Sequence, residues 1–322
     1  MKVVFFGTPD FVVPIVDALH KTYRVPRAKE SGVVAVVTQP PSPAGRDKRI
    51  DHSPVDQWAW DKKIKVITGF NNSLPDADLG IVAAYGKIIP EKIIKHFPKG
   101  ILNLHPSLLP VFRGASPIQA AIVTDTNRTG LTVIKMDKLM DHGPIFSLFK
   151  EDVLPEDTTE TLRRKLFERS IQFLLDLIPN YLSKKIIPKE QDHAKATYTK
   201  IITREDGFID PTNLQKVIDN KTPRKKWVIS FVSNFTTQYS PVTIHQFIRA
   251  MTPWPGTWTL LRLTAGGQAP KRLKIIRAHL SQPTKHNPQL ILDEVQLEGK
   301  NPVSWEEFKR GYPNTALTRD GV

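Results

Sequence analysis

The chain has 322 residues, 40% of them apolar and 24% charged, which is typical of a globular protein with room for two domains. It has no cysteine, no apolar run long enough to cross a bilayer and an N-terminal apolar run that residues 7–10 interrupt too early for export. Disulfides, thiolate metal sites and a cysteine nucleophile are thereby excluded, and we expect a cytoplasmic protein. The formal charge of +14 favours a polyanionic partner.

The first half of the chain alternates short β-branched runs with helical patterns. We expect strands at 3–6, 32–37, 79–85, 101–105 and 131–136, and helices near 11–21, 54–63, 90–96 and 116–124. Most of these strands are apolar on both faces, as buried parallel strands are. The pattern predicts an α/β fold with an open, mostly parallel, doubly wound sheet, and ligands bind at the carboxyl ends of strands in such sheets.

The second half of the chain begins with a longer helix, expected at 158–178. The composition changes after about residue 205, where segment 211–243 is polar and basic. Beyond it lie a helix pattern at 244–251 and two strand patterns at 273–278 and 289–295. We therefore predict three parts: a catalytic domain over 1–205, a linker or insertion over 206–243, and a small, basic, mostly-β (OB-like) domain over 244–322.

The basic residues gather in one stretch of the chain. No acidic residue occurs between Asp219 and Asp293, although the stretch contains eleven lysine and arginine residues: Lys221, Arg224, Lys225, Lys226, Arg249, Arg262, Lys271, Arg272, Lys274, Arg277 and Lys285. A segment of one charge sign attracts anions. The stretch therefore favours a nucleic-acid surface, and the alternative is an ordinary solvated face.

Asn103 and His105 stand at the end of the expected strand 101–105. Because one residue separates them on a strand, their side chains project from the same face. Pro106 keeps His105 extended, which carries the strand to the edge where a pocket should open. An amide beside an imidazole suits acyl transfer, since the amide can stabilise an oxyanion while the imidazole exchanges a proton with an amine. The alternative is a histidine that is merely hydrogen-bonded at a strand end.

Two neighbouring segments favour the catalytic interpretation. The loop SLLPVFRGA at 107–115 is too specific for ordinary turn chemistry, and MDKLMDHGPIF at 136–146 offers Asp137 and Asp141. An aspartate near His105 could orient the ring and stabilise its protonated form. His142 is a competing candidate, but no amide side chain is placed beside it.

The segments NLHPSLLPVFRGASPIQ and MDHGPI resemble the 10-formyltetrahydrofolate-dependent formyltransferases. This resemblance implies that Asn103, His105 and Asp141 form a catalytic trio and that the folate donor is the co-substrate, without a metal. It also implies a folate pocket with the following lining residues: Ala84, Tyr85, Gly86, Ile88, Ser107, Leu108, Leu109, Pro110 and Asp137.

Other segments of the chain indicate which molecule accepts the formyl group. Residues 5–11, 38–49, 196–210 and 248–258 resemble the branch of that family that formylates the methionine carried by initiator tRNA, for translation initiation. The resemblance casts three cations of the PAGR loop as RNA contacts, although Pro and Gly would also suit a flexible turn there. With the cations of the basic stretch, the expected RNA contacts are Arg46, Lys48, Arg49, Lys271, Arg272 and Lys274. We expect a monomer.

Two alternatives keep parts of this interpretation. One alternative acceptor is the amine of a nucleotide-linked sugar, because enzymes of that kind share the N-x-H motif and the SLLP loop. A non-catalytic folate- or RNA-binding protein on the same fold is a further alternative. The segment 211–243 has no close counterpart in the family pattern, and the C-terminal domain is short for the family's small barrel.

Overall fold

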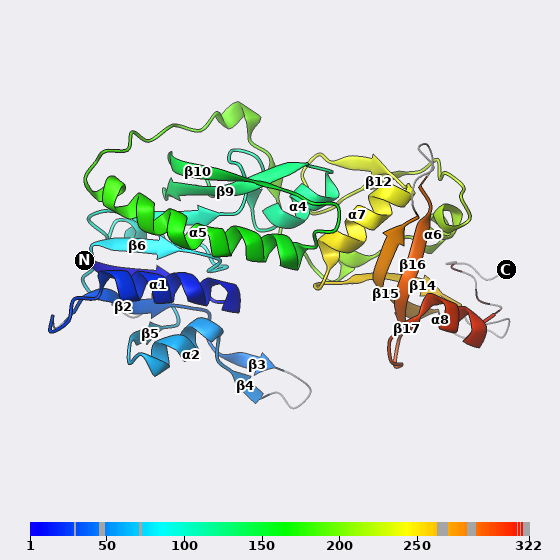
Figure 1. The fold of residues 1–322 in the computed structure, drawn as a ribbon, viewed down its shortest axis with the longest axis horizontal. Helices are drawn as coiled ribbons and strands as arrows, with labels where there is room; N and C mark the ends of the chain where they lie inside the picture. The colour runs from blue at the N-terminus through cyan, green and yellow to red at the C-terminus, as the bar shows by residue number, and fades with distance from the viewer. Residues whose placement is uncertain are drawn as a thin grey trace. The chain divides into compact units, whose positions relative to one another are not determined.

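A computed structural model describes residues 1–28, 30–44, 49–70, 73–262, 270–281 and 288–313, together with Thr315 and Leu317 (Figure 1). The chain divides into two compact units. The first comprises Met1–Gly114, Arg128–Asp152 and Arg163–Thr197, and the second comprises Ala115–Asn127, Val153–Leu162 and Tyr198–Val322. The domain boundaries near residues 205 and 243 stay a prediction.

The first unit is built on a mixed sheet. Among the described residues seven strands lie in the order β10 (Ile145–Asp152), β9 (Arg128–Lys135), β7 (Ile101–His105), β6 (Leu79–Val82), β1 (Lys2–Phe6), β2 (Gly32–Val37) and β5 (Lys65–Ile67). The five strands from β7 to β5 are parallel, whereas β9 and β10 are antiparallel additions at one edge. This confirms the α/β fold with a mostly parallel sheet.

Helices of this unit pack on the parallel strands. The helix α1 (Val13–Tyr23) packs on β2, and α2 (Pro54–Asp61) packs on β2 and β5 (Figure 1). The helix α2 begins where Ser53 accepts a hydrogen bond from the Asp56 N–H, with Pro54 in the first turn, and this start agrees with the expected helix at 54–63. A short α3 (Glu91–Ile94) follows β6.

Within the mixed sheet, three strands depart most from the sequence prediction, each for a physical reason. The expected strand 79–85 ends at Val82 because Ala84 and Gly86 have positive φ angles of 49° and 80°, which turn the chain. The strand β5 was not expected because it has three residues. The strand β10 was not expected because it lies at the sheet edge, where only one of its eight residues is buried and no apolar run forms.

The second unit contains an antiparallel sheet of four described strands. These are β14 (Thr257–Leu261), β15 (Lys271–Leu280), β16 (Leu290–Leu297) and β17 (Val303–Ser304). The helix α7 (Pro241–Met251) packs on β14, β15 and β16, and α8 (Trp305–Gly311) packs on β16. A small C-terminal antiparallel sheet is thus confirmed. The helix α4 (Pro117–Val123), although early in the chain, packs against α7 in this unit.

The segment expected to be a linker or insertion is folded. It contains α6 (Pro211–Ile218) and the hairpin of β12 (Lys226–Val228) and β13 (Thr236–Gln238). Trp227 of this hairpin stacks on Tyr239, with ring centroids 4.6 Å apart, and packs on Phe247 of α7. Buried aromatic contacts of this kind stabilise the segment as part of the second unit.

The longest described helix is α5 (Thr159–Leu182), which extends four residues beyond the expected end at 178. Its apolar face includes Leu162, Leu166 and Leu174, all buried as the periodicity predicts. In the part of the chain that the structure describes, no helix combines the length and apolarity needed to span a membrane.

His245 on α7 generates a prediction about stability. Burial, followed by the charges of Arg249 and His279, lowers the pKa of His245 from 6.5 to about 4, although Asp293 acts in the opposite direction. Between pH 6.5 and 4 the imidazole of His245 is therefore protonated in the unfolded chain but neutral in the folded chain. The free energy of unfolding consequently falls as pH falls through this window. We expect His245→Asn to lose about 2–4 °C less in Tm than the wild type between pH 7 and 4.

Thermal unfolding followed by circular dichroism over that pH range measures the difference. His96→Asn, which removes an exposed histidine of the first unit, is the matched control. Parallel profiles for the wild type and His245→Asn would show that the half-buried imidazole of His245 does not contribute to the pH dependence.

Candidate active site

Asn103 and His105 lie on one face at the carboxyl end of β7. His105 is 4% exposed, and its Nε2 lies 3.0 Å from the carbonyl oxygen of Phe112. Because a carbonyl oxygen only accepts, Nε2 must carry a proton. In the neutral ring Nδ1 is therefore unprotonated and available to accept a proton, and it lies 3.5 Å from Oδ1 of Asp141.

Asp141 lies in the loop between β9 and β10. Its carboxylate accepts hydrogen bonds from Nδ2 of Asn103, at 3.1 Å, and from the backbone N–H of Gly114, at 2.8 Å. The backbone of Asp141 has a φ of 49°, a left-handed conformation that is uncommon outside glycine. The structure thus brings together the side chains of Asn103, His105 and Asp141.

This arrangement can support proton transfer at an electrophilic carbon. The amide of Asn103 has two N–H groups, and one of them is committed to Asp141. The second can stabilise a developing oxyanion, while Nδ1 of His105 accepts a proton. The carboxylate of Asp141 can then balance the charge of the imidazolium.

A second histidine–aspartate pair lies on the same loop. Nδ1 of His142 donates to Oδ2 of Asp137 at 2.7 Å, and Asp137 also accepts from the N–H of Leu139 at 2.8 Å. Both side chains are about one-third exposed, at 30% and 37%. The ring of His142 stacks on that of His193, with centroids 4.0 Å apart. No amide side chain bonds to this pair among the described residues, unlike the pair of His105 and Asp141.

The SLLP loop, predicted to contact the folate, is fixed by internal hydrogen bonds. Ser107 donates through Oγ to the carbonyl of Val111, and the Leu109 N–H donates to Oγ1 of Thr132. Leu109 itself is 5% exposed, and its peptide bond to Pro110 is cis. Leu108 lies near Gly130, where an added Cβ would come within 2.6 Å of its side chain. The loop therefore presents a defined surface beside His105.

The other expected folate segment follows β6. Since Val82 pairs with Asn103 in register, residues 83–88 leave the sheet at the same edge as the trio. Tyr85 is buried against Phe6, and its carbonyl accepts from Gln39 at 2.9 Å. The side chain of Ile88, in contrast, is 81% exposed. These two expected folate residues thus differ in accessibility.

The expected RNA contacts fall in two places. Arg46 and Lys48 lie outside the described residues, as does the side chain of Arg49 at the start of β4 (Arg49–Asp51). On β15, the side chains of Arg272 and Lys274 are exposed, and Lys271 is half-buried. Arg272 stacks over the ring of Trp258 at 4.3 Å and lies 3.6 Å from Glu205. Its charge is therefore partly engaged within the second unit.

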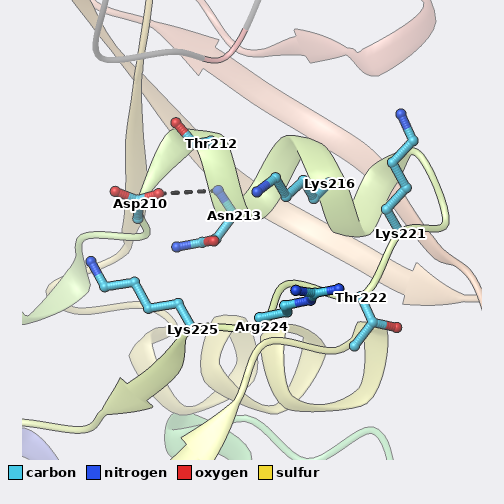
Figure 2. A pocket seen from close by; sticks show the side chains of 8 residues that line it. All are labelled: Asp210, Thr212, Asn213, Lys216, Lys221, Thr222, Arg224 and Lys225. Atoms are coloured by element: carbon cyan, nitrogen blue, oxygen red, sulfur yellow. Dashed lines mark hydrogen bonds between the residues drawn. The ribbon is translucent and has the colours of Figure 1, made fainter.

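A basic cavity that the sequence did not predict lies elsewhere in the second unit. Its volume is about 570 Å³, and Figure 2 shows the eight lining side chains, which come from the N-cap of α6, from α6 and from the segment after it: Asp210, Thr212, Asn213, Lys216, Lys221, Thr222, Arg224 and Lys225. Four of them are cationic and exposed. The described residues contain no group of three or more histidine, aspartate or glutamate side chains that could hold a metal ion.

Two buried residues next to the trio were missed by sequence reasoning. Arg113, 1% exposed, donates through Nε and Nη2 to Oε1 of Gln191, at 3.2 and 2.7 Å. Gln191, 5% exposed, donates in turn to the carbonyl oxygens of Asp141 and Gly143. The arginine in FRGA was a visible signal, because a buried guanidinium needs fixed acceptors. Nothing in the local pattern around Gln191 indicated a role.

Comparison with known proteins identifies the family. Residues 1–178 match the sequence model of the formyl transferase family, and residues 238–289 match the model of the formyl transferase C-terminal domain. A methionyl-tRNA formyltransferase from Roseiflexus castenholzii is 32% identical to this chain, in an alignment that covers 100% of this chain and 99% of the relative. A methionyl-tRNA formyltransferase from Dictyoglomus thermophilum is also 32% identical, and the alignment covers 97% of each chain. The chain therefore belongs to the formyl transferase family, in its methionyl-tRNA formyltransferase branch.

Solved structures share the fold at lower sequence identity. The N-formyltransferase from Helicobacter canadensis, in complex with folinic acid and dTDP-3-aminofucose, has a TM-score of 0.61 and 16% identity, covering 91% of this chain and 98% of that one. The methionyl-tRNA formyltransferase from Clostridium thermocellum has a TM-score of 0.54 and 19% identity, covering 92% and 98%. These likenesses establish the formyltransferase fold.

The two histidine–aspartate pairs give a direct test of the site. We expect His105→Asn to lower kcat roughly 10²–10⁴-fold, because it removes the imidazole base beside Asn103. We expect His142→Asn to stay within about 5-fold of the wild type, since that ring has no amide partner. Formyl-transfer turnover of the two variants measures the difference. Equal losses, or a larger loss in His142→Asn, would assign the chemistry to the other pair.

Proposed function

We propose that this protein transfers the formyl group of 10-formyltetrahydrofolate to the α-amine of methionine esterified to initiator tRNA, for translation initiation. The observation that carries the proposal is the convergence of an amide, an imidazole and a carboxylate at the end of β7. Membership of the methionyl-tRNA formyltransferase branch, over the full length of the relatives, supports the acceptor.

The proposed reaction forms one C–N bond and breaks another. The amine attacks the formyl carbon, and the second N–H of Asn103 stabilises the oxyanion. Nδ1 of His105 accepts the proton that the amine loses, with Asp141 balancing the imidazolium charge. The C–N10 bond then breaks, and the proton returns to N10 of the folate. In enzymes of this kind an oxyanion donor contributes roughly 10²–10³-fold to kcat.

The charge distribution supports an RNA acceptor. In this proposal Arg46, Lys48 and Arg49 of the PAGR loop contact the RNA backbone, together with Lys271, Arg272 and Lys274 on β15. Neutralised phosphates release counterions, so binding through such residues depends steeply on salt. Phosphate contacts position the RNA, while the chemistry at the amine is carried out by the trio. We further propose that the protein acts in the cytoplasm as a monomer.

The folate donor is assigned to the carboxyl edge of the sheet. The proposed pocket lies between the SLLP loop (Ser107, Leu108, Leu109 and Pro110) and the turn after β6 (Ala84, Tyr85, Gly86 and Ile88), and Asp137 of the loop between β9 and β10 is proposed as a further lining residue. Both the loop and the turn leave the sheet at the edge where Asn103 and His105 end β7. Ligands of open α/β sheets bind at this edge.

A nucleotide-linked sugar is the second candidate acceptor. The Helicobacter canadensis protein with a bound dTDP-sugar has the same fold, although fold likeness at 16% identity does not carry its acceptor to this chain. The names of the full-length relatives and the net charge of +14 favour RNA over a sugar nucleotide.

A single assay separates these acceptors. We expect the purified protein, supplied with 10-formyltetrahydrofolate, to form formylmethionine on charged initiator tRNA and to leave an amino-sugar nucleotide unmodified. The kcat/KM for tRNA should fall with salt, and Arg272→Gln/Lys274→Gln should reduce the slope of log kcat/KM against log salt by about 1–2. Asn103→Ala is the inactive control. Formylation of the sugar nucleotide without formylation of the tRNA would refute the proposal.

A further inference from the structure

A buried carboxamide connects two sides of the candidate active site. Oε1 of Gln191 accepts from Nε and Nη2 of Arg113, at 3.2 and 2.7 Å. Its Nε2 donates to the carbonyl oxygens of Asp141, at 2.9 Å, and Gly143, at 2.8 Å. The donor and the acceptor are determined in each of these hydrogen bonds, because an arginine side chain cannot accept and a carbonyl oxygen cannot donate. The amide therefore has one orientation and uses both of its ends.

The segment that carries Gln191 is anchored on the same loops. Lys189 exchanges two backbone hydrogen bonds of 2.8 Å with Ile145, where β10 begins. Thr197, near the other end of the segment, accepts from the Arg113 N–H at 2.8 Å through its carbonyl and from the Phe112 N–H through Oγ1. Gln191 is thus held between two anchored points and cannot easily follow a displaced loop.

The position of Asp141 depends on this contact. Its left-handed backbone has to be maintained by its surroundings, and Gln191 bonds to its carbonyl. On the other side, Gln191 holds Arg113, whose neighbour Gly114 donates to the Asp141 carboxylate. Gly143 lets the loop close, because a Cβ there would lie 1.9 Å from the carbonyl oxygen of Lys135.

We propose that Gln191 is a positioning residue that holds the main chain of Asp141, and thereby its carboxylate, beside Asn103 and His105. The inference rests on the proposed function of this trio. A misplacement of about 1 Å costs roughly 10²-fold in rate, so the effect should appear in kcat. Substrate binding through the folate pocket and the RNA surface should change little.

The test is a double-mutant cycle with a matched control. Gln191→Met keeps the side-chain length and removes all four hydrogen bonds, and we expect kcat to fall about 10²-fold with KM values within 3-fold. Asp141→Asn should cost much less in the Gln191→Met background than in the wild type, because the carboxylate is already displaced. Gln246→Met is the control, since Gln246 is 4% exposed and donates to Asp125 in the second unit. It should lower Tm and leave kcat unchanged.

The outcomes separate the inference from the proposed site. Multiplicative effects of Gln191→Met and Asp141→Asn, or a lowered Tm with an unchanged kcat, would make Gln191 merely structural. If Asp141→Asn alone leaves kcat unchanged, the proposed trio is wrong instead. Should Gln191→Met fail to fold, Gln191→Glu keeps the acceptor for Arg113 and replaces the donors to the loop by a carboxylate oxygen that repels the two carbonyl oxygens. The same loss of kcat is expected of it.

The basic cavity of Figure 2 supports a second, independent inference. It is formed between residues 210 and 225, outside both family matches at 1–178 and 238–289. Asn220, with a φ of 58°, ends α6, and the Lys221 N–H donates to the carbonyl of Lys216 at 2.7 Å. The chain then returns beside α6. This turn brings cations of the helix and of the returning segment to one cavity.

The cations of the cavity are not neutralised locally. Across the described ranges, Lys216, Lys221, Arg224 and Lys225 have no ion pair within 4.0 Å. The carboxylate of Asp210 caps α6 by accepting from the Asn213 N–H at 3.0 Å. All four cations reach solvent, whereas sites for small ligands enclose most of the ligand surface. The geometry points to phosphate groups of a large ligand, and we propose the backbone of the RNA acceptor.

Direct RNA binding tests this second proposal, which rests on the proposed acceptor. We expect Lys216→Gln/Arg224→Gln to raise the Kd for uncharged initiator tRNA about 10-fold at low salt and to reduce the salt slope by about 1–2. The kcat and the KM for the folate donor should not change. Lys309→Gln/Arg310→Gln on α8 removes the same charge from another exposed part of the second unit and is the control.

Four results would separate these possibilities. An unchanged Kd and salt slope would overturn the proposal, as would a loss of pyrophosphate binding with no effect on tRNA, which would indicate a site for a small anion. An equal effect of the control pair Lys309→Gln/Arg310→Gln would show that tRNA binding depends on the total positive charge of the protein and not on this cavity. A wild-type protein that binds tRNA without formylating it would refute the proposed function and leave the cavity's role standing.

Discussion

The site depends on the hydrogen bonds that the largely enclosed carboxylate of Asp141 accepts. A carboxylate that is 13% exposed loses most of its hydration and requires donors in return. It obtains them from Asn103 on β7 and from the backbone of Gly114. The loop that carries Asp141 must therefore meet two donors that precede it by 38 and 27 residues, and the backbones of Phe112 and Asp141 are left-handed where these segments meet.

The same loop after β7 also determines which nitrogen of His105 carries the proton. Phe112, with a φ of 59°, presents its carbonyl to Nε2 and so leaves Nδ1 for the reaction. A strand alone could align Asn103 with His105, since alternate residues share a face, but it could not select the tautomer. That selection requires the loop after β7 to fold back. The chemistry is therefore a property of loops fixed on a rigid sheet edge.

Sequence patterns predicted the elements whose information is local. The apolar runs of β1, β2 and β7 and the helix pattern of α2 were recognisable because each depends on neighbouring residues. Edge strand β10 and the short β5 have no such run, and their pairing depends on the rest of the sheet. Gln191 illustrates the limit most clearly, because its partners lie 48 to 78 residues away and glutamine in a loop is unremarkable.

Counting charges overstates the basic surface in one place and misses it in another. Arg272 belongs to the acid-free stretch, yet Trp258 and Glu205 already engage its guanidinium. Lys216 precedes that stretch, yet it joins Arg224 at one cavity because Asn220 reverses the chain. The potential at such a cavity depends on where cations without partners are placed, and the left-handed turn at Asn220 helps to place them. Residues between the two family matches can thus alter acceptor binding while the chemistry at β7 stays the same.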